Sequence, residues 1–129
     1  MASELKVNTL TGVSTAGSIA VTGEGNSTTT NLQQGLAKAW CDYDSAGTTF
    51  NDSFNMTSAT DNGAGDYTGT IANNMANTEW ALTAHSGQAV NRTESDVTVT
   101  AFEIHTMAQD GSTKGDTGRV MVAGHGDLA

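Results

Sequence analysis

The feature that most constrains this chain is its shortage of large apolar side chains. Leu, Ile, Val and Phe together supply 20 of the 129 residues, about 16%, whereas threonine alone supplies 21 and proline none. A charged chain with less than roughly 20% of these residues is typical of disorder. Folding requires enough buried apolar surface to offset the conformational entropy that the chain loses. We therefore expect a fold that completes its core with other copies of the same chain.

The apolar residues that are present alternate with polar ones in short runs, which is the pattern of half-buried β-strands. From Ala39 to Ala129 these runs are separated by turn-forming clusters such as Asp61–Gly65. This spacing predicts six or seven strands in an antiparallel β-sandwich head. At Ala101 the alternation changes phase, which predicts a strand buried on both faces or a β-bulge. The side chains expected in the core or an interface of the head are Trp40, Phe54, Met56, Tyr67, Trp80, Leu82, Phe102 and Val120.

Residues 1–38 form the other predicted domain, because they carry too few apolar side chains for a core of their own. Two short strands are expected, Glu4–Leu10 and Ser18–Thr22. One short helix of about two turns is expected from Asn31 to Ala39, with capping oxygens in Ser27–Thr30. The apolar side chains expected to face neighbouring subunits or another partner are Leu5, Val7, Ile19, Val21, Leu32 and Leu36. The chain is therefore predicted to be mainly β, with a narrow N-terminal base or stalk before the sandwich.

The charge balance excludes several classes of partner. Fourteen acidic residues against five basic ones give a formal net charge of −9, whereas nucleic-acid binding depends on clustered Lys and Arg. No apolar run approaches the roughly twenty residues that span a bilayer, and the N-terminus does not resemble a secretory signal. We therefore expect no nucleic-acid partner and no membrane insertion. The single cysteine, Cys41, rules out a disulfide within the chain and is expected to be a small buried hydrophobe.

No motif in the sequence makes a convincing catalytic or metal site, so we predict no enzyme, no cofactor and no bound metal. Asp116-Thr117-Gly118 is the tripeptide of aspartic proteases, and a small all-β dimer can supply two such carboxylates. Those proteases bury the aspartate behind an apolar strand, whereas the polar segment Ser112–Gly115 leads in here. The tripeptide is also an ordinary turn sequence. A retroviral-type protease therefore stays a remote alternative.

The histidines and acidic turns are expected to have structural or solvated roles. His85, His105 and His125 lack the close pairing of metal motifs, and only Glu103 and His105 form a local pair on one strand face. The acidic turns, Asp42–Asp44 and Asp61–Asp66, do not match the spacing of a calcium loop. The aromatic side chains that could stack on sugar rings if exposed, but whose alternation predicts core positions, are Trp40, Tyr43, Tyr67 and Trp80.

Three stretches of the chain resemble structural proteins of marine tailed bacteriophages. They are Ala2–Gly12 (ASELKVNTLTG), Val21–Trp40 (VTGEGNSTTTNLQQGLAKAW) and Asp52–Thr68 (DSFNMTSATDNGAGDYT). Residues 90–129 are the least similar part. The resemblance implies a homotrimeric virion appendage and brings no catalytic residues with it. The chain is very short for a tail fibre, which needs an attachment region, a shaft and a receptor-binding tip, so a short fibre or decoration protein on the capsid fits better.

The resemblance thus implies a non-enzymatic virion protein, made in the host cytoplasm, whose partners are its own copies and the major capsid protein or other virion proteins. An alternative is a tail fibre that binds a receptor, with a host-surface glycan as its ligand. In that case the receptor-facing loops are expected around Asp61–Asp66 and His85–Arg92, with Asp61, Asn62, Asp66, His85 and Arg92 as contact residues. Capsid attachment is expected through residues 1–30.

Overall fold

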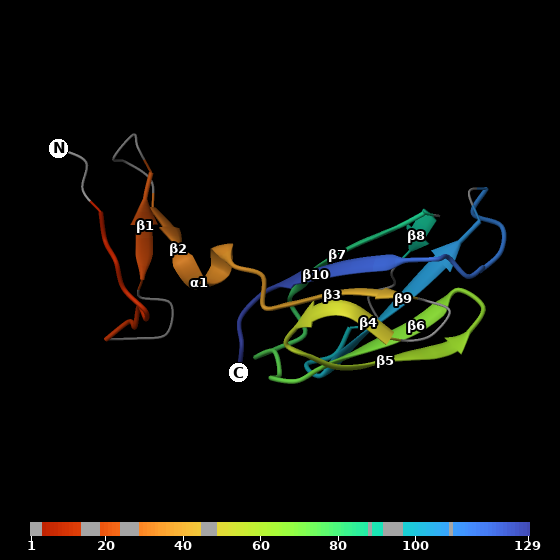
Figure 1. Cartoon of the computed structure of the whole chain (residues 1–129), viewed down its shortest axis with the longest axis horizontal. Helices are drawn as coiled ribbons and strands as arrows, with labels where there is room; N and C mark the ends of the chain where they lie inside the picture. Colours follow the sequence, from red (N-terminus) through yellow and green to blue (C-terminus); the bar gives the residue numbers. More distant parts are fainter. Residues whose placement is uncertain are drawn as a thin grey trace. The chain divides into compact units, whose positions relative to one another are not determined.

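The chain divides into two compact units, Met1–Leu36 and Ala37–Ala129. The computed structural model describes residues 4–13, 19–23, 29–44, 49–87, 89–91, 97–108 and 110–129. Strands are the main element throughout, their ladders are antiparallel, and a single short helix lies among the described residues (Figure 1). The predicted mainly-β fold is therefore confirmed.

The N-terminal unit contains one two-stranded ladder and one turn of helix. Strand β1 (Ala20–Thr22) pairs antiparallel with strand β2 (Thr29–Asn31). Helix α1 (Leu32–Gly35) begins at Asn31, whose Oδ1 accepts hydrogen bonds from the backbone N–H groups of Gln33 (2.8 Å) and Gln34 (3.1 Å). That side chain satisfies two of the N–H groups that a helix start leaves unpaired.

Two predictions for this unit are wrong. The helix has one turn instead of two, because Leu36 is already extended at φ −98° and ψ 141° and Ala39 begins a sheet strand. Pairing in that sheet outweighs the weak helical preference of a segment that contains Gly35. The expected strand Glu4–Leu10 is not formed, since these residues pair with no strand in the described part of the chain. Of the expected strand Ser18–Thr22, only Ala20–Thr22 is a strand, and Ser18 lies outside the described residues.

The second unit is a sandwich of two four-stranded antiparallel sheets (Figure 1). The first sheet has the order β4 (Thr49–Phe54), β3 (Ala39–Asp44), β10 (Val120–His125), β7 (Ala81–Ser86). The second has the order β5 (Met56–Gly63), β6 (Asp66–Ile71), β9 (Ala101–Met107), β8 (Ala89–Asn91). Side chains alternate between the interior and the outer face along β3, β6, β9 and β10, as half-buried strands require.

Aromatic side chains join the two sheets across the core. The rings of Tyr43 on β3 and Tyr67 on β6 meet edge to face, with centroids 5.7 Å apart, and Trp80 meets Phe102 at 6.2 Å. The core consists of the buried side chains of Ala39, Cys41, Tyr43, Tyr67, Ile71, Met75, Trp80, Val97, Phe102, Ile104, Val120 and Val122. Of the residues predicted for the core or an interface, Tyr67, Trp80, Phe102 and Val120 are buried, whereas Trp40, Met56 and Leu82 are half-buried.

Phe54 is not in the core of the single chain, since 52% of its surface is exposed. A bulge in β4 explains the difference. Tyr43 pairs with Phe50 but Asp42 pairs with Asp52, so Asn51 is an extra residue in β4. One extra residue turns every later side chain to the opposite face. Phe50 therefore packs against the core, while Phe54 lies on the outer face opposite Trp40.

Asn55 marks the point where the chain crosses from one sheet to the other. Its φ is +58°, in the left-handed region that Asn tolerates better than most residues. Its side-chain Nδ2 donates to the carbonyls of Lys38 (2.8 Å) and Asn73 (3.1 Å), and its Oδ1 accepts from the Asn73 N–H at 2.7 Å. The chain is thereby divided at Asn55 into β4 and β5.

The change of phase at Ala101 comes from a turn, so the expected doubly buried or bulged strand is wrong. Val97 forms an antiparallel bridge with Phe102, and the backbone N–H of Thr98 donates to the Ala101 carbonyl. The Thr98 Oγ1 accepts hydrogen bonds from the N–H groups of Thr100 (3.2 Å) and Ala101 (2.9 Å). This local side-chain bonding favours a turn over a continuous strand.

Cys41 is expected to be inert in the folded protein and reactive only after unfolding. Only 2% of its surface is exposed, and burial together with the charge of Asp42 raises the pKa of its thiol from 9.0 to about 12. The thiolate is the nucleophile, so iodoacetamide at pH 8 should leave the native thiol unmodified. Mass spectrometry should show one carbamidomethyl group after denaturation. Rapid alkylation of the native chain would contradict this placement.

Candidate functional site

The N-terminal unit exposes the apolar side chains that the sequence assigned to an interface. The exposed fractions are 78% for Leu5, 56% for Val7, 51% for Val21 and 54% for Leu36, and Ile19 and Leu32 are half-buried. No side chain is buried in the part of this unit that the structure describes, 4–13, 19–23 and 29–36. The unit thus has an apolar surface without an internal core in the single chain.

The residues predicted to face a receptor do not all lie together. Asp61 and Asn62 lie near the end of β5 and Asp66 begins β6, so these three share one hairpin. Asn62 Nδ2 donates to Thr68 Oγ1 at 2.8 Å, which holds the amide along the hairpin. His85 lies within strand β7 of the other sheet and not in a loop. Arg92 lies outside the described residues.

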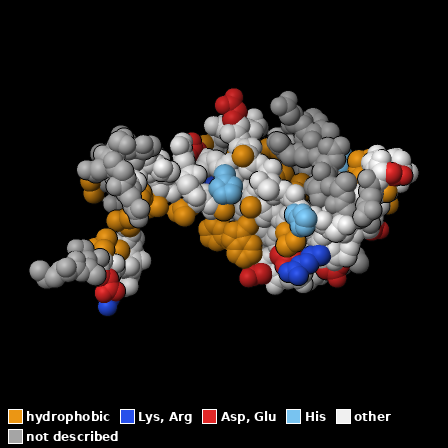
Figure 2. Space-filling view, turned by 90° about the horizontal axis from the view of Figure 1, so that it is seen from above, with side chains coloured by type: hydrophobic (Ala, Val, Ile, Leu, Met, Phe, Trp, Pro, Cys, Tyr) orange, Lys and Arg blue, Asp and Glu red, His pale blue; other side chains and the backbone are white. Residues whose placement is uncertain are grey.

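The outer face of the β4-β3-β10-β7 sheet combines aromatic, acidic and histidine side chains. Cross-strand pairing aligns Phe54, Trp40 and Ala123 in one row and Asp52, Asp42 and Met121 in the next. Alternation places His85 on the same outer face, and His125 is also exposed. Figure 2 shows a hydrophobic patch on this unit with histidines and paired acidic and basic groups beside it. Of the four aromatic residues considered for stacking, only Trp40 is on this surface, because Tyr43, Tyr67 and Trp80 are buried.

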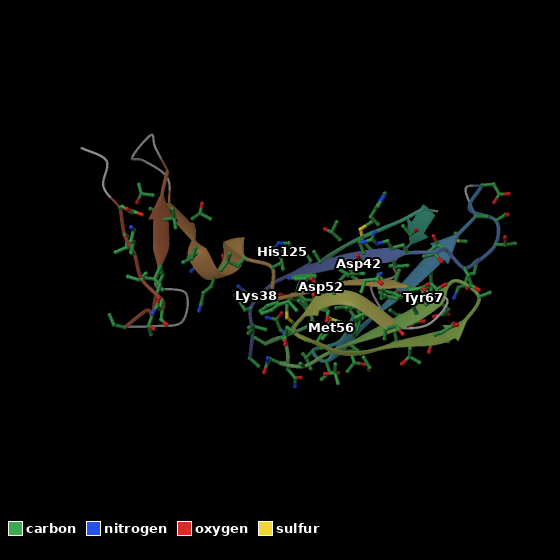
Figure 3. The ribbon with its side chains drawn as sticks, viewed as in Figure 1. Lys38, Asp42, Asp52, Met56, Tyr67 and His125 are labelled. Atoms are coloured by element: carbon green, nitrogen blue, oxygen red, sulfur yellow. The ribbon has the colours of Figure 1, made fainter. Side chains whose placement is uncertain are left out.

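Two carboxylates border the aromatic row, and one of them is held by arginine. Asp42 and Asp52 lie on the neighbouring strands β3 and β4 (Figure 3). The Arg119 guanidinium donates to both oxygens of Asp42, with Nε 2.6 Å from Oδ1. This hydrogen bond, with a further one from Asn51, lowers the pKa of Asp42 from 3.8 despite partial desolvation.

The Asp42–Arg119 pair is expected to make stability fall in acid. A carboxyl whose pKa is lower in the folded state stabilises the fold above the unfolded pKa, and that contribution is lost as pH falls through the folded value. Thermal unfolding followed by circular dichroism should therefore show the natural chain more stable than Asp42→Asn at neutral pH. The difference should disappear well below pH 3.8. Arg119→Gln should behave the same way, and a double variant that lost the sum of both effects would contradict the pairing.

The protease-like aspartate has a structural role in this fold. Asp116 Oδ1 accepts hydrogen bonds from the Gly65 N–H at 2.8 Å and from the Tyr67 hydroxyl at 3.0 Å. These contacts attach the segment after β9 to the β5–β6 hairpin. The buried Thr106 continues the junction, because its Oγ1 donates to the Gly115 carbonyl at 2.7 Å.

A polar cluster lies on the outer face of the second sheet. His105 Nε2 is 3.1 Å from Glu103 Oε1 and 3.4 Å from Asp66 Oδ2, and Lys114 Nζ is 2.7 Å from the same Asp66 oxygen. Burial acts to raise the pKa of Asp66, but hydrogen bonds with Lys114, Glu103 and Asn62 outweigh it and lower the pKa below 3.8. The two-residue spacing of Glu103 and His105 predicts that pair, whereas Asp66 is brought beside it only by the pairing of β6 with β9.

In the described part of the chain, no helix has the length and apolar character needed to cross a bilayer. No protein-family model, curated protein or solved structure matches this chain.

Proposed function

We propose that this chain is a non-enzymatic structural protein of a tailed-phage virion, a short homotrimeric fibre or decoration protein on the capsid surface. The observation that supports it most is the N-terminal unit, which exposes Leu5, Val7, Val21 and Leu36 and buries no side chain among its described residues. Apolar surface of this kind usually marks an interaction site. Copies of the chain packed side by side would cover this apolar surface. The proposal of three copies comes from the resemblance of residues 2–12 and 21–40 to virion proteins.

The two units suit different tasks in such a particle. The N-terminal unit would contact neighbouring copies and the major capsid protein or another virion protein. The sandwich has its own aromatic core and would form the exposed head. A net charge of −9 keeps many copies soluble and mutually repelling.

Oligomeric state tests the shared interface directly. Sedimentation equilibrium of the full chain should give about three times the 13.2 kDa chain mass. The variants Val21→Asn and Leu36→Gln should reduce association, since each places an amide where an apolar contact is expected. Thr22→Asn is a matched control on the same exposed strand and should remain trimeric. A natural chain that is monomeric yet unfolds in one cooperative transition over its whole length would overturn the proposal.

Location on the particle separates a decoration protein from a tail component. Electron cryomicroscopy of intact virions, with labelled Fab fragments against the sandwich, should show many copies distributed over the capsid. Labelling confined to a few copies at the tail would instead support a fibre. Absence of the protein from purified particles would overturn both.

A second candidate function is recognition of a host-surface glycan, and the outer face of the first sheet favours it. Phe54 is 52% exposed opposite the half-buried Trp40, with Asp42 and Asp52 in the next row. Aromatic rings stack on sugar rings while neighbouring carboxylates bind their hydroxyls. A glycan array probed with the natural chain should give signals that Phe54→Ser removes and that Thr83→Ser, on the same sheet, retains. No bound glycan at all would remove this candidate.

A further inference from the structure

We propose that Asp66, Glu103 and His105 form a binding site for one divalent transition-metal ion, with Zn²⁺ as the best-suited probe. The site lies on the outer face of the β5-β6-β9-β8 sheet and shares no residue with the apolar interface or with the aromatic surface of the first sheet, although Asp66 is also among the residues that the sequence assigns to receptor contact. It therefore goes beyond the proposed function and does not depend on it.

The spacing of the three side chains is that of ligands around one ion. Zn²⁺ binds imidazole nitrogen and carboxylate oxygen at about 2.0–2.2 Å, so two ligands in tetrahedral geometry are about 3.3 Å apart. His105 Nε2 is 3.1 Å from Glu103 Oε1 and 3.4 Å from Asp66 Oδ2. All three ligand atoms lie within 4.8 Å of one another. An ion can therefore contact all three after only small side-chain adjustments.

Paired strands hold the ligands in position. Glu103 and His105 are two apart on β9 and thus share its outer face, and Asp66 on β6 is the cross-strand partner of His105. The exposed fractions of the side chains are 17% for His105, 21% for Asp66 and 34% for Glu103. The cluster is thus accessible to an ion from solvent yet partly shielded, which strengthens its interaction with a cation.

The ligand types indicate the class of metal. Ca²⁺ and Mg²⁺ favour sites built entirely of oxygen, whereas one imidazole with two carboxylates suits Zn²⁺, Mn²⁺, Co²⁺ or Ni²⁺. Three protein ligands leave at least one position on the ion for water.

Lys114 is the expected competitor for the site. Its ammonium is 2.7 Å from Asp66 Oδ2, and 41% of its side chain is exposed, so it can turn away into solvent. A bound dication would be repelled by this charge. Removing the ammonium should therefore strengthen metal binding, whereas removing a ligand should weaken it. The loss of affinity on replacing His105 distinguishes the site from a general acidic surface, where removing a histidine takes away no negative charge.

The test is titration calorimetry of the full chain with ZnCl₂ in a buffer free of chelators. One ion per chain is expected, with affinity at least about tenfold weaker in His105→Asn and Glu103→Gln. Lys114→Met should bind several-fold more tightly. His85→Asn is the matched control, a histidine on the other sheet, and should bind as the natural chain does. Co²⁺ should give visible absorption bands in the natural chain that His105→Asn lacks.

Two results would overturn the site: no Zn²⁺ binding by the natural chain up to millimolar concentration, or binding that is retained in His105→Asn and lost in His85→Asn. Circular dichroism establishes whether His105→Asn is folded. If it is not, Glu103→Gln and Lys114→Met decide the question, because unchanged affinity in both would exclude this cluster.

Discussion

Gly65→Ala is expected to destabilise the sandwich by at least about 3 kcal/mol, a large share of the 5–15 kcal/mol typical of a whole domain. Gly65 has φ +65°, where an added Cβ is strained, and that Cβ would lie 2.3 Å from the Thr106 carbonyl oxygen and 2.5 Å from the Gly115 nitrogen. Both neighbours are backbone atoms that cannot move aside independently. The same shift would break the Gly65 N–H bond to Asp116. Denaturant unfolding followed by circular dichroism measures the loss.

Substitutions at two other glycines separate the two causes of destabilisation, backbone strain at positive φ and the close contact of the added Cβ with backbone atoms. Gly111 has φ +69° but open space around its Cβ position, so Gly111→Ala should cost only the backbone strain, about 1–2 kcal/mol. Gly118 has neither a positive φ nor a neighbour within 4 Å, and Gly118→Ala should stay within about 0.5 kcal/mol of the natural chain. If Gly65→Ala and Gly111→Ala lowered the free energy of unfolding equally, the close backbone contact at Gly65 would contribute nothing to the destabilisation.

Trp80→Ala is expected to cost about 3–5 kcal/mol, the range for removing a large buried aromatic. Trp80 is 5% exposed and packs edge to face with Phe102. Its ring also covers Gly124, where an added Cβ would approach the ring to 2.8 Å. Removing the indole would leave a cavity against rigid backbone that cannot collapse. The Thr98 carbonyl would also lose the indole N–H bond of 3.2 Å.

Trp40→Ala is the matched control, because Trp40 is the other tryptophan and lies half-buried on the outer face of the first sheet. Its loss should destabilise the chain by less than half as much, since part of that ring is already in contact with water. Thermal and urea unfolding of both variants give the comparison. A greater loss for Trp40→Ala would reverse the assignment of core and surface.

The alternation of apolar residues was enough to predict β3, β6, β7 and β10, because each has one face against the core throughout. The alternation did not predict the positions at which the strands are interrupted. The extra residue at Asn51 and the crossing at Asn55 depend on backbone conformation and on hydrogen bonds to segments distant in sequence. Neither leaves a periodic signal. Phe54, which was expected in the core or an interface, consequently lies on the outer face instead of in the core.

The two candidate sites differ in how far they could be predicted from the sequence. Exposed apolar residues in 1–36 followed from composition, since so few of them cannot bury one another. The metal cluster could be only half predicted. Glu103 and His105 are two apart in sequence, but Asp66 reaches them through the register of β6 against β9. Such a register depends on the whole sheet, and no short motif encodes it.

The bulge in β4 affects how readily two copies of the sandwich associate through their sheet edges. β4 is an edge strand of its sheet, and a regular edge offers unpaired backbone groups to any other strand that approaches. The extra Asn51 interrupts that row and twists the strand locally. Edge-to-edge joining of two sandwiches is thereby hindered at this side. Two copies that meet in concentrated solution can thus stay separate folded sandwiches instead of merging into a continuous sheet.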